Sequence, residues 1–166
     1  MINNRIGRVA LRHERPALVG ELLTDFQGRT GAAHTVAFGL DGVLLGHAGH
    51  PEDERAQVRA EQSASSSYML ASLCTGVAAT WPAERRPAGP LHADHLLLRH
   101  RAGIDPQTGE RPSPWWVLVV PVPDWGGLVT ELPPDREAPV ASVMGDLLEC
   151  ADRIRGVLAD AHRQAG

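Results

Sequence analysis

His34-Thr-Val-Ala-Phe-Gly-Leu-Asp-Gly-Val-Leu-Leu-Gly-His-Ala48 is the stretch of sequence that decides the fold. Up to Leu40, larger side chains alternate with smaller ones, which is the period of a β-strand. Asp41-Gly42 suits the positive φ angles of a two-residue turn, and residues 43–48 can then return antiparallel to the first strand. The stretch therefore predicts a β-hairpin.

An amphipathic helix is predicted before this hairpin. It opens at Arg15 and Pro16, where the missing N–H of proline is harmless, and its apolar face carries Leu18, Val19, Leu22, Leu23 and Phe26. Residues 1–15 are predicted to be an extension, and residues 16–163 to form a single domain. The extension carries four arginines where a signal peptide would need its apolar region, so we expect a cytoplasmic protein.

A long second helix is predicted after the hairpin, from the acidic residues 52–54 to about Thr80. It carries two neighbouring stripes. The large stripe consists of Leu70, Leu73, Cys74, Val77 and Trp81, and the small stripe of Ala60, Ala64, Ser67, Ala71, Thr75 and Ala78. We expect the large stripe to lie on the domain's own sheet. The small stripe is predicted to be the dimer or partner interface, because small side chains allow another helix to approach closely.

The rest of the chain predicts three strands and a last helix. The strands are expected at residues 91–100, 115–122 and 128–132, with a long polar connection at residues 103–114. The helix begins near Pro139 and presents one apolar stripe of Val140, Val143, Met144, Leu147, Ala151, Ile154 and Leu158. The order of helices and strands predicts an α/β (α+β) domain, and the composition, 43% hydrophobic and 22% charged, is that of one globular unit.

Sequence signatures of catalysis are missing. There is no glycine-rich loop ending in Gly-Lys-Ser/Thr, no lysine at all and no Gly-x-Ser-x-Gly. We therefore predict that the protein is not an enzyme, has no catalytic residues and binds no cofactor. A net charge of −4 without a basic patch argues against nucleic acid as a partner. No segment has the sequence of a membrane span.

Several residues with metal-binding or catalytic side chains have simpler interpretations. His47 and His50 could converge, but no cysteine near them has zinc-site spacing, so no metal site is predicted. Cys74 and Cys150 have apolar neighbours and are expected to be buried thiols without a disulfide. The carboxylates of Glu149 and Asp152 lie beside arginines in the sequence and are interpreted as a solvated face.

Two motifs carry a resemblance to a known family. Phe38-Gly-Leu-Asp-Gly-Val-Leu-Leu-Gly46 and Leu70-Ala-Ser-Leu-Cys-Thr-Gly76, with the order of elements over about residues 16–160, resemble the bacterial Roadblock/dynein light chain family. This family has a profilin-like or longin-like α/β architecture. The resemblance implies a five-stranded antiparallel sheet with the long helix on one face and the other two helices on the opposite face. Members typically form homodimers by pairing their third strands and packing their second helices side by side.

The resemblance also implies a function. Bacterial members are commonly encoded with small Ras-like GTPases, often beside a sensor kinase, and bind the GTPase across the helical face of the dimer. We therefore expect a non-catalytic homodimeric regulator or scaffold of such a GTPase in bacterial signalling. Arg55 and Arg59 are possible GTPase contacts, because an arginine supplied in trans can stabilise the transition state of GTP hydrolysis. The alternative is a small-ligand sensory module of the PAS, GAF or profilin-like kind, which needs a cavity.

Overall fold

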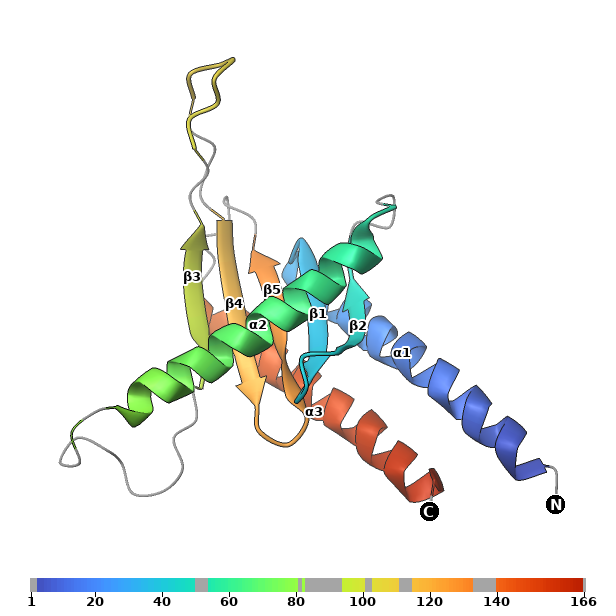
Figure 1. Cartoon of the computed structure of the whole chain (residues 1–166). Helices are drawn as coiled ribbons and strands as arrows, with labels where there is room; N and C mark the ends of the chain where they lie inside the picture. Colours follow the sequence, from blue (N-terminus) through green and yellow to red (C-terminus); the bar gives the residue numbers. More distant parts are fainter. Residues whose placement is uncertain are drawn as a thin grey trace.

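The computed structural model describes residues 3–49, 54–80, 82, 94–100, 103–110, 115–132 and 140–165. Within them the elements follow in the order α1 (Asn3–Thr30), β1 (His34–Gly39), β2 (Leu44–Ala48), α2 (Ala56–Ala79), β3 (Leu96–His100), β4 (Trp115–Val122), β5 (Gly126–Leu132) and α3 (Val140–Ala165). The predicted order of elements is confirmed. A five-stranded antiparallel sheet has the strand order β2-β1-β5-β4-β3, with α2 on one face and α1 and α3 on the other (Figure 1).

The sheet separates two apolar cores. On the α2 side, Val36 and Phe38 pack with small residues of the helix and with the neighbouring strands. On the other side, α1 and α3 bury a larger cluster that includes Leu23, Phe26, Leu118, Leu128, Leu147 and Ile154. Because both faces are covered, β1 is buried along its whole length. The apolar stripe predicted for the last helix is confirmed where its side chains are described, from Val143 to Leu158.

The hairpin that decides the fold forms, but its turn is one residue longer than predicted. The Gly39 N–H donates to the Val43 carbonyl at 2.8 Å, and the Gly42 N–H donates to the Gly39 carbonyl at 2.9 Å. Gly42 takes the left-handed conformation, with φ +76°. The loop therefore comprises residues 40–42, the three-residue type in which a turn is followed by a left-handed glycine. The two-residue prediction was wrong.

The predicted start of the first helix was also wrong. α1 begins at Asn3, and Pro16 lies inside it. A proline inside a helix removes one backbone hydrogen bond, but the residues before it include good helix formers such as arginine, alanine and leucine. Proline therefore did not mark the helix start. The predicted domain boundary, with residues 1–15 as an extension and the domain beginning at residue 16, stays a prediction.

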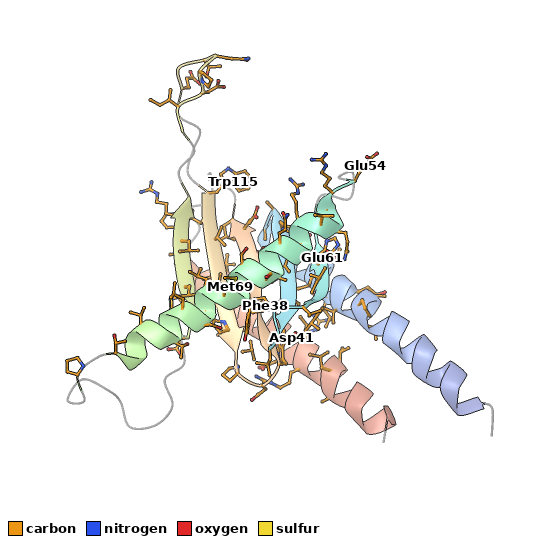
Figure 2. All side chains as sticks on the ribbon, in the orientation of Figure 1. Phe38, Asp41, Glu54, Glu61, Met69 and Trp115 are labelled. Carbon is orange, nitrogen blue, oxygen red and sulfur yellow. The ribbon has the colours of Figure 1, made fainter. Side chains whose placement is uncertain are left out.

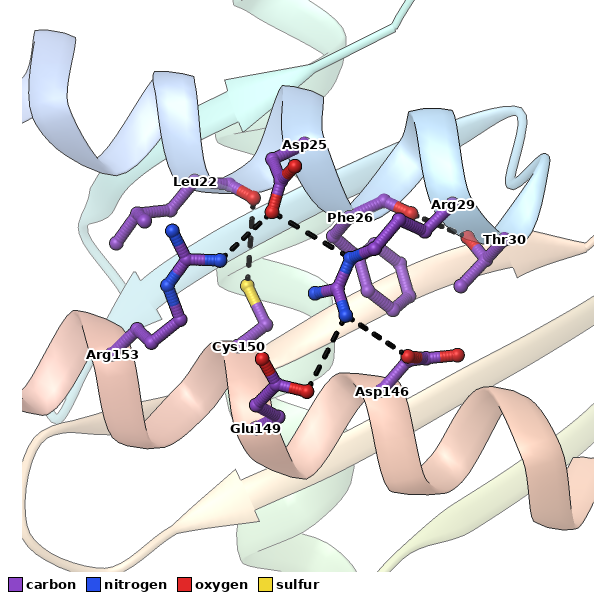
Figure 3. A network of polar contacts seen from close by, with 9 residues as sticks. All are labelled: Leu22, Asp25, Phe26, Arg29, Thr30, Asp146, Glu149, Cys150 and Arg153. Carbon is purple, nitrogen blue, oxygen red and sulfur yellow. Dashed lines mark hydrogen bonds and ion pairs between the residues drawn. The ribbon is translucent and has the colours of Figure 1, made fainter.

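A network of ion pairs joins α1 to α3 (Figure 3). Arg29 contacts Asp146 at 3.1 Å and Glu149 at 3.3 Å, while Arg153 contacts Asp25 at 2.8 Å. Desolvation lowers the pKa of Arg29, but the hydrogen bond to Glu149 and the surrounding carboxylates outweigh it, so the pKa is raised. These pairs are partly exposed and align the two helices more than they stabilise the fold.

The two stripes of α2 face the opposite way from the prediction. Ala60 and Ala64 are fully buried against the sheet of the same chain and Ser67 is 6% exposed, whereas Leu73 is 64% exposed. The assignment of Ala60, Ala64 and Ser67 to a partner interface was therefore wrong. The physical reason is that large strand residues such as Phe38 fill the space below the helix, so only small helix residues fit.

The remaining members of the two stripes are less buried or lie outside the described part. Ala71 and Thr75 are half-buried. The side chain of Ala78 and the whole of Trp81 fall outside the described residues. Of the large stripe, Leu70 and Cys74 are half-buried, and Val77 is 54% exposed.

We expect Ala64→Leu to destabilise the fold without changing the oligomeric state. Three extra carbon atoms at a fully buried helix–sheet contact would force α2 away from the sheet, at a cost of about 1–3 kcal/mol. Urea unfolding measures this loss. The control is Ser65→Leu at the next position, which is exposed. A stable variant of altered mass would mean that Ala64 faces a partner after all.

Candidate interaction surface

The outer side of α2 carries an apolar surface that nothing in the described part of the chain covers. Met69, Leu73 and Val77 recur every four residues and are 66%, 64% and 54% exposed. Met69 stands on the side of α2 that faces away from the sheet (Figure 2). Side chains of this size, aligned along one side of a helix, are typical of surfaces that bind another protein.

β3 provides a second open surface beside the first. It lies at the edge of the sheet and pairs only with β4, so in the described residues its outer backbone groups have no strand partner. Leu98 lies opposite Val117, which packs into the core below α2, so Leu98 is on the same face of the sheet. Trp115 precedes Val117 by two residues and shares that face. Leu98 and Trp115 are 41% and 38% exposed.

Arg55 and Arg59 lie at the opposite end of α2 from Met69 and Val77. Both are exposed. Arg59 lines a small hollow of about 100 Å³ together with His34, Ala56, Ser63 and Glu131. The structure therefore places the two predicted GTPase contacts at the amino-terminal end of α2, separate from its apolar half.

Metal-ligating side chains do not gather into a cluster in the described part of the chain. No set of three or more His, Cys, Asp or Glu side chains among them lies close enough to hold a metal ion. His47 Nε2 is 3.2 Å from Gln57 Oε1, and His50 is outside the described residues. In the same part of the chain, no helix is long and apolar enough to cross a membrane.

Comparison with known proteins identifies the fold. No protein-family model matches the sequence, and no curated protein matches it. Solved structures do. A Roadblock/LC7 domain from Streptomyces avermitilis matches with a TM-score of 0.61 at 15% identity, covering 84% of this chain and 97% of that one. The fold is that of a Roadblock/LC7 domain. The resemblance and the fold class predicted from the sequence are thereby confirmed.

Two further solved structures with this Roadblock fold are bacterial MglB proteins. MglB of Myxococcus xanthus matches with a TM-score of 0.59 at 11% identity, covering 86% of this chain and 89% of that one. The gliding protein MglB of Thermus thermophilus matches with a TM-score of 0.55 at 15% identity, covering 90% of this chain and 92% of that one. At these identities the likeness establishes the architecture of the chain.

Sequence reasoning missed Met69 and Leu98 of the apolar surface on α2 and β3. For Trp115-Trp116 the sequence predicts one indole on each face of the strand, one in the core and the other either covered by a helix or available to a partner. One signal could have revealed Met69. It shares a four-residue spacing with Leu73 and Val77, on the side of the helix away from Ala60 and Ala64. Leu98 needed the strand order, which shows that β3 is an edge.

The two cysteines lie in different environments. Cys150 is 1% exposed, as predicted, and its Sγ lies 3.8 Å from the Leu22 carbonyl oxygen, whereas Cys74 on α2 is only half-buried. Burial raises the pKa of the Cys150 thiol to about 11, against a smaller lowering by Arg153. Cys150 therefore stays a neutral thiol at physiological pH.

We expect Cys74→Ser to leave a chain whose one remaining thiol reacts slowly. At pH 8 the ionised fraction of a thiol with a pKa near 11 is roughly a hundredfold below that of an ordinary cysteine, and burial slows attack further. Timed reaction with Ellman's reagent measures this, and the rate should rise with pH until about pH 11. Full reactivity after unfolding in urea is the control. Fast reaction of the native variant at pH 8 would contradict the burial of Cys150.

Proposed function

We propose that this chain is a non-catalytic homodimeric regulator or scaffold of a small Ras-like GTPase in bacterial signalling. One observation carries the proposal. The Roadblock fold presents an uncovered apolar surface on α2 directly beside an open strand edge. Together they form a surface suited to binding proteins.

A second copy fits this surface. Pairing of β3 with the β3 of another copy would satisfy the outer backbone groups of both strands and continue the sheet across the dimer. It would also bring the two α2 helices together on one face of the extended sheet. Met69, Leu73 and Val77 would then lose their exposure to water, and this burial is the main driving force of such an interface.

The GTPase is proposed to bind across the α2 face of the dimer. Arg55 and Arg59 lie exposed at the amino-terminal end of this helix and could contact an acidic surface. Two mechanisms are open: an arginine acting in trans on the nucleotide, or stabilisation of the GTPase's own switch segments by shape. We favour the second because family resemblance supports it. The same resemblance makes a sensor kinase a candidate partner.

We expect Leu73→Arg to convert the dimer to monomer. An arginine forced into the centre of the apolar interface should weaken association by at least about thirtyfold. Sedimentation equilibrium should show half the mass of the wild-type protein, with an unchanged circular dichroism spectrum. Leu18→Arg is the matched control, because Leu18 is 45% exposed but lies on α1, across the sheet. A wild-type protein that sediments as a monomer would refute the dimer.

Binding of a GTPase to this chain is tested with purified Ras-like GTPases encoded in the source genome, each loaded with GDP or with a non-hydrolysable GTP analogue. We expect one of them to bind with a preference between nucleotide states, and Leu73→Arg to abolish this binding. If the domain acts by stabilising the switch segments of the GTPase through shape, Arg59→Ala should weaken binding by about tenfold or less. Any effect of the domain on the rate of GTP hydrolysis should then remain unchanged. A loss of turnover of about a thousandfold would instead indicate a trans-acting arginine. No binding by any of these GTPases would overturn the proposal.

The sensory alternative has one structural feature in its favour. A hollow of about 320 Å³ lies between α2 and the turn end of the sheet, lined by apolar residues and by the side chains of Tyr68, Ser72 and Thr75. This volume is at the small end of the range for small-molecule sites. We rank the alternative second, because it leaves the exposed surface of α2 unexplained.

A further inference from the structure

A second surface suited to binding lies at the end of the sheet where the β1–β2 and β4–β5 turns meet. A groove of about 630 Å³ runs there beside the carboxyl-terminal half of α3. Apolar side chains line most of it: Leu40, Leu45, Trp125, Leu158 and Ala159. Leu40 is 57% exposed, so a substantial part of this lining faces water.

The charged groups at this groove are predominantly acidic. Asp41 and Asp124 line it together with Arg155. Arg155 is already paired with Asp124 at 3.2 Å and with Asp152, and these two carboxylates are each 69% exposed. The positive charge of Arg155 is therefore more than neutralised, and Asp41 adds to the excess. A groove of this kind complements a segment that is apolar and basic.

The chain itself contains a segment of that composition. Residues 3–15 hold four arginines and one glutamate, together with Ile6, Val9 and Leu11. They belong to α1, whose 28 residues make it about 42 Å long. The longest strand, with 8 residues, spans only about 26 Å. The amino-terminal part of α1 consequently overhangs the sheet, at the same end as the groove (Figure 1).

The geometry of α1 indicates which copy the segment would reach. α1 is one continuous helix, and its amino-terminal part extends away from the sheet (Figure 1). The segment could fold back onto its own groove only if α1 broke. A groove on another molecule imposes no such requirement, and opposite charges would favour the encounter.

We propose that the arginine-rich start of α1, residues 3–15, docks into the acidic groove of a second copy of this chain. This contact is separate from the α2 surface and goes beyond the proposed function. It would join dimers, or monomers where the α2 surface fails, into larger assemblies. If the exchange is reciprocal the assembly closes, and if it is not the assembly grows as a filament.

Two charge variants of the full chain test the proposal by complementation. The segment variant carries Arg5→Glu, Arg8→Glu and Arg12→Glu. The groove variant carries Asp41→Asn and Asp124→Arg, and the asparagine retains an oxygen to accept the Val43 N–H that Asp41 now binds at 3.1 Å. Analytical ultracentrifugation should show that dimers of each variant alone, or its monomers where the α2 dimer does not form, join into larger assemblies at least about tenfold more weakly than those of wild type. An equimolar mixture should regain association, because it again contains native segments and native grooves.

The controls separate this proposal from the proposed function. Glu110→Arg, an exposed charge reversal on residues 103–110 outside the groove, should leave association unchanged. The same comparison in a Leu73→Arg background measures the segment contact alone, whatever becomes of the α2 dimer. Association should also weaken as NaCl is raised from low to high concentration.

Three results would overturn the proposal. One is a wild-type protein that forms no assembly larger than the α2 dimer, or than the monomer where that dimer does not form, at any concentration. Another is a pair of variants that assemble as wild type does. The third is a segment variant whose only defect is lost binding to vesicles of anionic phospholipid, which would make residues 3–15 a lipid-binding segment.

Discussion

The close approach of α2 to the middle of the sheet is the contact on which the rest of the structure depends. Ala60 and Ala64 are fully buried there, against Val36 and Phe38 of β1. A larger side chain at either alanine would lift the helix and expose the core beneath it. Because the contact uses the small side of α2, the large apolar residues of the helix are turned to solvent.

The strands beneath α2 are as closely packed as the helix above them. Thr35 and Thr130 face each other across β1 and β5, fully buried, with their hydroxyl oxygens 2.9 Å apart. At the end of the same pair, a Cβ atom on Gly126 would lie 1.8 Å from the Phe38 carbonyl oxygen, so only glycine fits. The middle of the sheet thus has little freedom to adjust to a partner. The surfaces proposed for partner binding accordingly lie elsewhere, on the outer side of α2, at the edge strand and at the turns.

The sequence predicted the order of helices and strands correctly, but it predicted wrongly which side of α2 packs against the sheet. The alternation of side chains in residues 34–40 and the apolar spacing in α3 reflect the local backbone geometry of a strand and of a helix. That geometry does not depend on which other elements pack nearby, so both elements could be predicted. The prediction for the two stripes of α2 was wrong for a physical reason. Helical spacing shows that Ala64 and Leu73 lie on different sides, but which side meets the sheet depends on the size of the strand residues below. The same limit applies to β3, whose position at an edge follows from strand order.

The chemistry of the exposed surfaces suggests how their interactions could be kept apart. The α2 surface is apolar around Met69 and Leu73, so the binding proposed there would depend on burial and respond weakly to salt. The groove at the turn end combines apolar residues with unbalanced carboxylates, so the docking proposed there would depend on charge as well. Salt or an acidic competitor would therefore shift the second proposed contact while leaving the first in place. A domain built this way could change its assembly without releasing a partner held on α2.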